Sequence, residues 1–103
     1  MTTADAIMLT LYTHGKVRGR TKLLRHVTEL PIDAPIVQGE FGLYPENGFD
    51  VLEMLDNFDF IIATELDRGW EYEIADLGKM FVDDKLKDDV SSEEWELIRK
   101  PLK

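Results

Sequence analysis

The sequence KVRGRTKLLR (residues 16–25) is basic throughout and carries Gly19 at the position where a turn is expected. Before it, apolar residues recur at helical spacing, which predicts a helix over residues 3–14. After it, the same spacing resumes over residues 21–30 and stops at Pro31, which predicts a second helix. The basic segment is therefore a turn and the start of the helix that follows it.

The charge of this segment differs from that of the rest of the chain. No Asp or Glu occurs between Ala6 and Thr28, so this stretch carries +5, while the remaining residues carry −14 and the chain as a whole carries −9. A small basic face can attract an anion even when the whole protein repels it. The five positive charges belong to Lys16, Arg18, Arg20, Lys22 and Arg25.

Length and composition indicate one ordinary globular domain. The chain has 103 residues, of which 44% are hydrophobic, enough to build a single core. It has no cysteine, which excludes disulfide scaffolds and thiolate zinc sites. Its longest near-apolar run, residues 6–12, is too short to span a bilayer, so we expect a cytoplasmic protein without membrane contact. The sequence pI of about 4.6 argues against a protein that coats nucleic acid generally.

The middle of the chain predicts a long connection, a helix and a hairpin. Residues 31–48 contain three prolines and three glycines, with room for a short strand at residues 36–37. Helical spacing resumes over residues 49–60. Two β-rich runs, residues 61–66 and 70–74, then flank a three-residue loop that ends in glycine, which is typical of a β-hairpin.

The C-terminal part predicts two further helices. One is expected over residues 75–87, and the serine and glutamate of Ser91-x-x-Glu94 form a capping-box pattern that opens a short terminal helix. We therefore expect a domain over residues 1–90 and a terminal element over residues 91–103, either a dimer contact or a cover for the core. The predicted inner face of the fourth helix consists of Leu77, Met80 and Phe81.

This order of elements resembles a winged helix-turn-helix domain. Five short stretches are similar to those of a group of small, mostly archaeal winged-helix proteins, and the resemblance covers roughly residues 4–86. They are IMLTLY (residues 7–12), GRTKL (19–23), FGLY (41–44), LDNF (55–58) and YEIADLGK (72–79). The resemblance implies an α+β fold with a three-helix core, a β-hairpin wing and extra C-terminal helices. It also implies DNA binding and dimerisation.

On this resemblance the leading hypothesis is a homodimeric transcriptional regulator that binds double-stranded DNA. The basic turn and second helix would hold the phosphate backbone, and one arginine would reach a groove from the wing. The predicted DNA-contacting residues are Lys16, Arg18, Arg20, Lys22, Arg25 and Arg68.

The third helix favours a different hypothesis. It is acidic, and no Lys or Arg occurs between Gly48 and Asp67, so DNA phosphates would repel it. The alternative is a winged-helix interaction module that binds a basic protein partner and not DNA. Its predicted partner-binding residues are Asp50, Glu53, Asp56 and Trp95.

The two hypotheses predict different surroundings for the basic side chains. DNA binding needs them exposed on one face, whereas the interaction module predicts that carboxylates of the chain itself, or of a dimer mate, pair with them. Arg20 is expected to be structural in either case, paired with a carboxylate from the third helix or the connection before it.

No pattern indicates catalysis or a cofactor. The chain lacks a phosphate-binding glycine loop, a nucleophile elbow and a Cys–His pair. Its only histidines, His14 and His26, do not have metal-ligand spacing, and His26 is expected on the outer basic stripe of the second helix. We therefore expect a protein that is not an enzyme and holds no metal.

Overall fold

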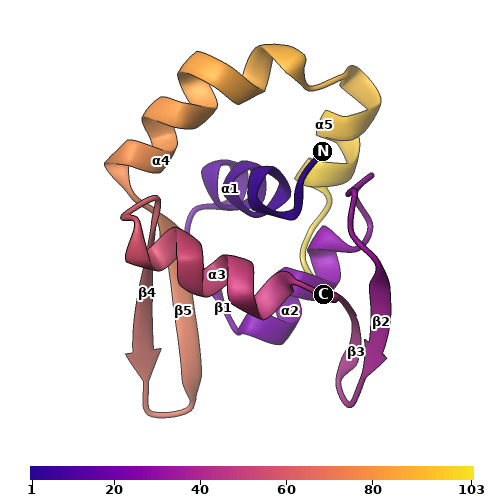
Figure 1. Cartoon of the computed structure of the whole chain (residues 1–103), viewed down its shortest axis with the longest axis vertical. Helices are drawn as coiled ribbons and strands as arrows, with labels where there is room; N and C mark the ends of the chain where they lie inside the picture. The colour runs from indigo at the N-terminus through magenta and orange to yellow at the C-terminus, as the bar shows by residue number, and fades with distance from the viewer.

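Helix α1 (Thr3–His14) crosses the middle of the molecule in the computed structural model, which describes residues 1–103 (Figure 1). All residues from Ala6 to Leu11 are buried, because other elements cover the helix on several sides. Gly15 ends the helix with a positive φ of 76°, and its N–H donates to the Leu11 carbonyl. The first predicted helix is confirmed.

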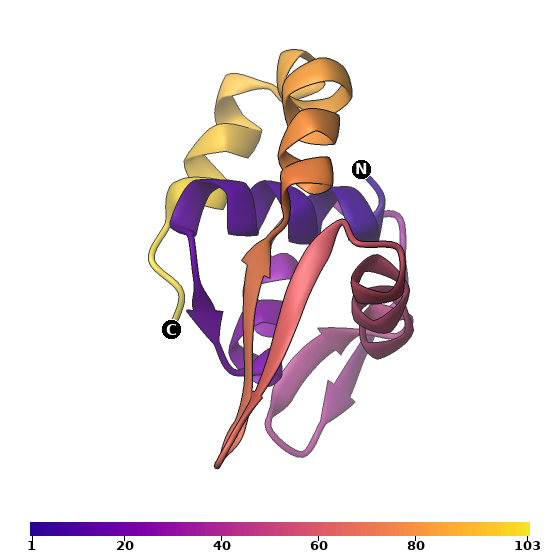
Figure 2. The same cartoon turned by 90° about the vertical axis from the view of Figure 1, so that its left-hand side faces the viewer.

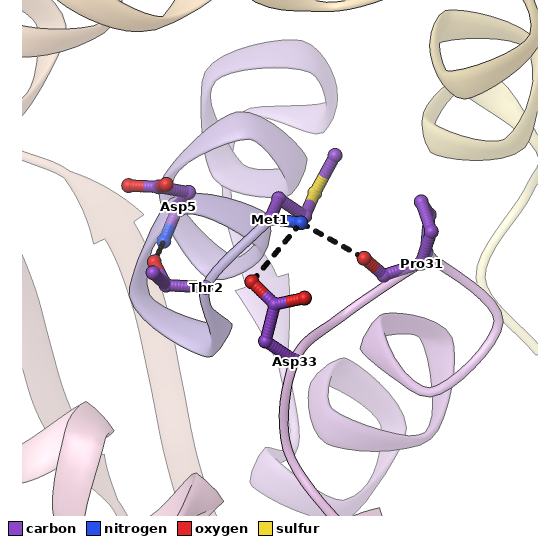
Figure 3. A network of polar contacts seen from close by, with 5 residues as sticks. All are labelled: Met1, Thr2, Asp5, Pro31 and Asp33. Atoms are coloured by element: carbon purple, nitrogen blue, oxygen red, sulfur yellow. Dashed lines mark hydrogen bonds and ion pairs between the residues drawn. The ribbon is translucent and has the colours of Figure 1, made fainter.

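Polar contacts tie the start of α1 to the segment that follows the second helix (Figure 3). The amine of Met1 donates to the Pro31 carbonyl at 2.9 Å and lies 3.6 Å from a carboxylate oxygen of Asp33. Thr2 caps the helix, since its hydroxyl accepts a hydrogen bond from the Asp5 N–H at 3.0 Å. These contacts hold the start of α1 against the segment that follows the second helix.

The basic turn contains a short strand, β1 (Val17–Arg18), followed by helix α2 (Arg20–Val27). Strand β1 pairs with β5 (Gly69–Ile74), which also pairs with β4 (Ile61–Leu66), so the order in this antiparallel sheet is β1-β5-β4. The predicted hairpin is confirmed. Its loop is one residue tighter than expected, because Gly69 already pairs with Leu66 and takes a φ of 101°.

The long connection folds into a second hairpin. Strands β2 (Ile36–Gly39) and β3 (Gly42–Pro45) pair in an antiparallel manner and lead into helix α3 (Gly48–Asn57). The short strand expected at residues 36–37 is thus part of a longer structure. Both hairpins project to the same side of α1, while the C-terminal helices lie on its other side (Figure 1, Figure 2).

The fourth helix has three parts and faces the core differently from our prediction. Helix α4 (Asp76–Phe81) continues as a π-helical turn η1 (Val82–Leu86) and a 3-10 turn η2 (Lys87–Asp89). Leu77 and Met80 are exposed, so their predicted burial is wrong, and Phe81 is only partly buried.

The reason is a close approach at Gly78. A Cβ atom at this position would collide with the Phe60 carbonyl oxygen, so only glycine lets α4 lie against the end of the first sheet. This contact turns Gly78 and Val82, one helical turn apart, toward the core, and both are buried. Leu77 and Met80 consequently point away from it.

Helix α5 (Ser92–Arg99) closes the core. The predicted capping box is present, and Ile98 is fully buried among α1 and α2 residues. The result is an α+β fold with five α-helices and two small antiparallel sheets, so the predicted α+β class is confirmed, and the second sheet was not predicted. None of the helices has the length and apolar character needed to span a bilayer.

Candidate functional site

Two of the five basic side chains lie beside carboxylates of the first sheet. The amine of Lys16 is 3.8 Å from a carboxylate oxygen of Glu73, and Arg18 is 3.6 Å from Glu71. The strand register explains this, because Arg18 stands directly opposite Glu71 in the β1–β5 pair. Two of the five basic side chains therefore have carboxylate partners within the chain.

Arg20 and Arg25 are engaged in other ways. The guanidinium carbon of Arg20 lies 5.3 Å from the ring centroid of Trp70 and 5.8 Å from that of Phe49, and it forms no ion pair. The carboxylate partner that we expected for Arg20 is thus absent, and aromatic rings take its place. Arg25 donates to the backbone carbonyls of Phe41 and Lys103.

Lys22 and Arg68 remain exposed without an ion pair. Arg68 lies at the tip of the β4–β5 hairpin, where it and Arg18 line a shallow hollow together with two carboxylates, Glu65 and Asp67. The six predicted DNA-contacting residues therefore do not form one free basic face.

The acidic residues of α3 have the opposite character. Asp50 and Glu53 are exposed and form no ion pair. Asp56 is partly buried, and one of its carboxylate oxygens accepts a hydrogen bond from the Ala63 N–H at 3.2 Å. This bond holds the C-terminal half of α3 against strand β4.

These three carboxylates line a groove between α3 and the first sheet, which we call the acidic–aromatic groove. Its volume is about 330 Å³. Burial raises the pKa of the Tyr72 phenol at its base, while the positive charge of Arg20 acts in the opposite direction. The other side chains that line it are Arg20, Phe49, Leu52, Ala63 and Trp70.

The aromatic part of this groove was not predicted. Tyr72 is buried, whereas Trp70 is only partly buried. Phe49 lies far from Trp70 in the sequence, and no local pattern indicates that both contact the same guanidinium. The grouping results from the packing of α2, α3 and β5.

Trp95 lies away from the groove, on α5. It is partly buried against the core, and the guanidinium carbon of Arg99 lies 5.2 Å from its ring centroid. Of the four residues predicted for partner binding, the structure brings together Asp50, Glu53 and Asp56.

The two histidines meet at the end of α5. His26 is buried, so its predicted place on the outer basic stripe is wrong. The Nε2 atom of His26 lies 3.2 Å from the Ile98 carbonyl oxygen, and that of His14 lies 2.6 Å from the same oxygen. Burial lowers the pKa of His26 below its usual value of 6.5, and this effect outweighs the opposing hydrogen bond to Ile98.

Comparisons with protein-family models, curated proteins and solved structures find no match to this chain.

Proposed function

We propose that this chain is a winged-helix interaction module that binds a basic segment of a partner protein through the acidic face of α3. The order of the elements supports the fold assignment. Helices α1 to α3 precede a hairpin, β4–β5, that joins β1 in one sheet, and the hairpin would be the wing. In this assignment α2 and α3 are the helix-turn-helix pair, with the β2–β3 hairpin inserted between them.

The observation that carries the proposal is the contrast between the two charged surfaces. Four of the five basic side chains have partners within the chain, namely carboxylates, aromatic rings or backbone carbonyls. The exposed carboxylates Asp50 and Glu53 have none and are free to meet a cation. A helix with this charge would be repelled by phosphates but attracted to lysine and arginine side chains.

DNA binding is the second candidate, and the weakness of the surface ion pairs favours it. The side chains of Lys16 and Arg18 are 64% and 74% exposed, and exposed pairs of this kind contribute about 0–1 kcal/mol. Phosphates could therefore compete for these cations, with Lys22 and Arg68 as additional contacts. In this case the protein would act as the DNA-associated regulator that the resemblance implies.

One titration series compares the two candidates. Fluorescence anisotropy of a labelled oligolysine peptide and of a labelled mixed-sequence DNA duplex is measured against the intact protein, from low to moderate salt. We expect the peptide to bind and the duplex to remain free. The double variant Asp50→Asn/Glu53→Gln should weaken peptide binding several-fold, because it removes two carboxylates from α3.

The control is the double variant Glu93→Gln/Glu96→Gln on α5, which removes the same charge from exposed positions elsewhere. It should weaken peptide binding much less than the α3 variant. Equal effects of the two variants would contradict the proposal. Salt-sensitive binding of the duplex that is lost in a Lys22→Ala/Arg25→Ala variant would establish the DNA candidate in its place.

A further inference from the structure

We infer that the acidic–aromatic groove is a binding site for one arginine side chain of the partner protein, which rests on the function proposed above. The groove combines a volume of about 330 Å³ with carboxylates from α3 and aromatic rings from both α3 and β5. A guanidinium group is planar, carries its charge at any physiological pH, pairs with carboxylates through two parallel hydrogen bonds and stacks on aromatic faces. The carboxylates and the rings therefore match its two modes of recognition.

The chain's own Arg20 demonstrates this chemistry at the edge of the groove. Its guanidinium lies within about 6 Å of two ring centroids, the range in which a cation is attracted to a ring face. Arg20 is itself one of the residues that line the groove, and the volume of about 330 Å³ is what stays open beside it. Arg20 therefore leaves room for a second guanidinium group.

The charge of the groove favours a cation from outside. Asp50, Glu53 and Asp56 contribute −3 and Arg20 contributes +1, so the lining carries −2 when the carboxylates are ionised. Only Asp56 has a hydrogen bond within the chain, from the Ala63 N–H, and this leaves its second oxygen free. An arginine with its stem along Trp70 would place its charge beside these oxygens.

Nuclear magnetic resonance of the intact, nitrogen-15-labelled protein tests the inference with a blocked Gly-Arg-Gly tripeptide. The reporters are the indole N–H of Trp70 and the backbone N–H of Ala63, which lie in the groove wall. We expect saturable shifts of both signals, with a Kd on the order of 1 mM, as befits a single side chain. The same tripeptide with neutral citrulline in place of arginine should produce no saturable shift, and one with lysine should bind several-fold more weakly.

Two variants link the signal to the groove without altering its charge. Trp70→Leu removes one ring, and Ala63→Leu fills the opening, so each should abolish saturable binding of the arginine tripeptide. Trp95→Phe on α5 is the matched aromatic control and should bind like the unmodified protein. A dispersed amide spectrum shows that each variant is folded.

Two outcomes would overturn the inference. One is equal binding of the citrulline tripeptide, and the other is unchanged arginine binding in either folded groove variant. The oligolysine titration separates this failure from that of the proposed function. If α3-dependent oligolysine binding persists while the tripeptide result is negative, the interaction module stands and only the arginine site is refuted.

Discussion

At the scale of single residues, the imidazoles of His14 and His26 link the end of the chain to the first two helices. Both face the Ile98 carbonyl, one of the last carbonyls of α5 and therefore without a partner in its own helix. Two neutral rings that each carry hydrogen on Nε2 can donate to this oxygen together. Their ring centroids are 5.5 Å apart, so a proton on both would place two positive charges close to each other.

Stability is expected to depend on pH through His26. Its folded-state pKa lies below 6.5, so the unfolded chain binds more protons when the pH falls below that value. The contribution of His26 to the free energy of unfolding should be constant well above this pH and should decrease as the pH falls through 6.5 toward the folded-state pKa. Urea unfolding at a series of pH values measures this.

Substitution of His26 isolates its contribution, because the variant keeps His14, whose ring centroid lies 5.5 Å away, and the charged residues beside the ring. Arg25, Glu29 and Lys103 line the hollow beside His26, and the variant leaves all three in place. In a His26→Gln variant, the decrease between about pH 7 and pH 5 should become smaller. An identical decrease in this variant would assign the pH dependence to other groups.

At the scale of elements, α5 depends on the capping box at its start. The Ser91 hydroxyl accepts a hydrogen bond from the Glu94 N–H at 3.1 Å, and the Glu94 carboxylate accepts one from the Ser91 N–H at 2.8 Å. These bonds satisfy N–H groups that the helix itself cannot. The same helix carries Ile98, which is fully buried.

Replacing Ser91 with alanine should destabilise the protein by about 1 kcal/mol, the usual cost of losing such a cap. Urea unfolding followed by fluorescence measures the change, since Trp95 lies on the same helix. Ser92→Ala is the matched control, because Ser92 is the next residue, is exposed and makes no side-chain cap. Equal destabilisation by both substitutions would show that the cap contributes nothing specific.

At the scale of the whole molecule, the distribution of charge opposes compaction. The chain carries a net charge of −9, and its side-chain ion pairs are surface pairs at 3.4–3.8 Å that contribute little. The remaining carboxylates repel one another, and salt screens this repulsion, since the Debye length is about 10 Å at 0.1 M.

The melting temperature should therefore rise with sodium chloride. A gain of about 1 kcal/mol would correspond to about 4–8 °C for a domain of this length. Calorimetry at low and high salt measures the rise, which should be smaller for Glu93→Gln/Glu96→Gln because that variant carries less negative charge. A melting temperature that falls with salt would mean that the ion pairs outweigh the repulsion.

The homodimer stays a prediction, which light scattering on the intact chain tests.

Much of the fold follows from signals that act between neighbouring residues. The first helix covers residues 3–14, the runs 61–66 and 70–74 form a hairpin, and Ser91 with Glu94 opens the last helix, all as predicted. Each of these signals depends on hydrogen bonds or side-chain spacing within one or two turns of chain. The sequence alone was therefore sufficient to identify them.

Contacts between residues that are distant in the sequence decide which side of each helix is buried. They also form the candidate site. Gly78 packs against Phe60 and turns Leu77 outward, and His26 turns inward to reach Ile98. The acidic–aromatic groove likewise exists only because α2, α3 and β5 pack together around Arg20. Burial and charge pairing are properties of the packed chain, and no pattern confined to a single helix or strand contains them.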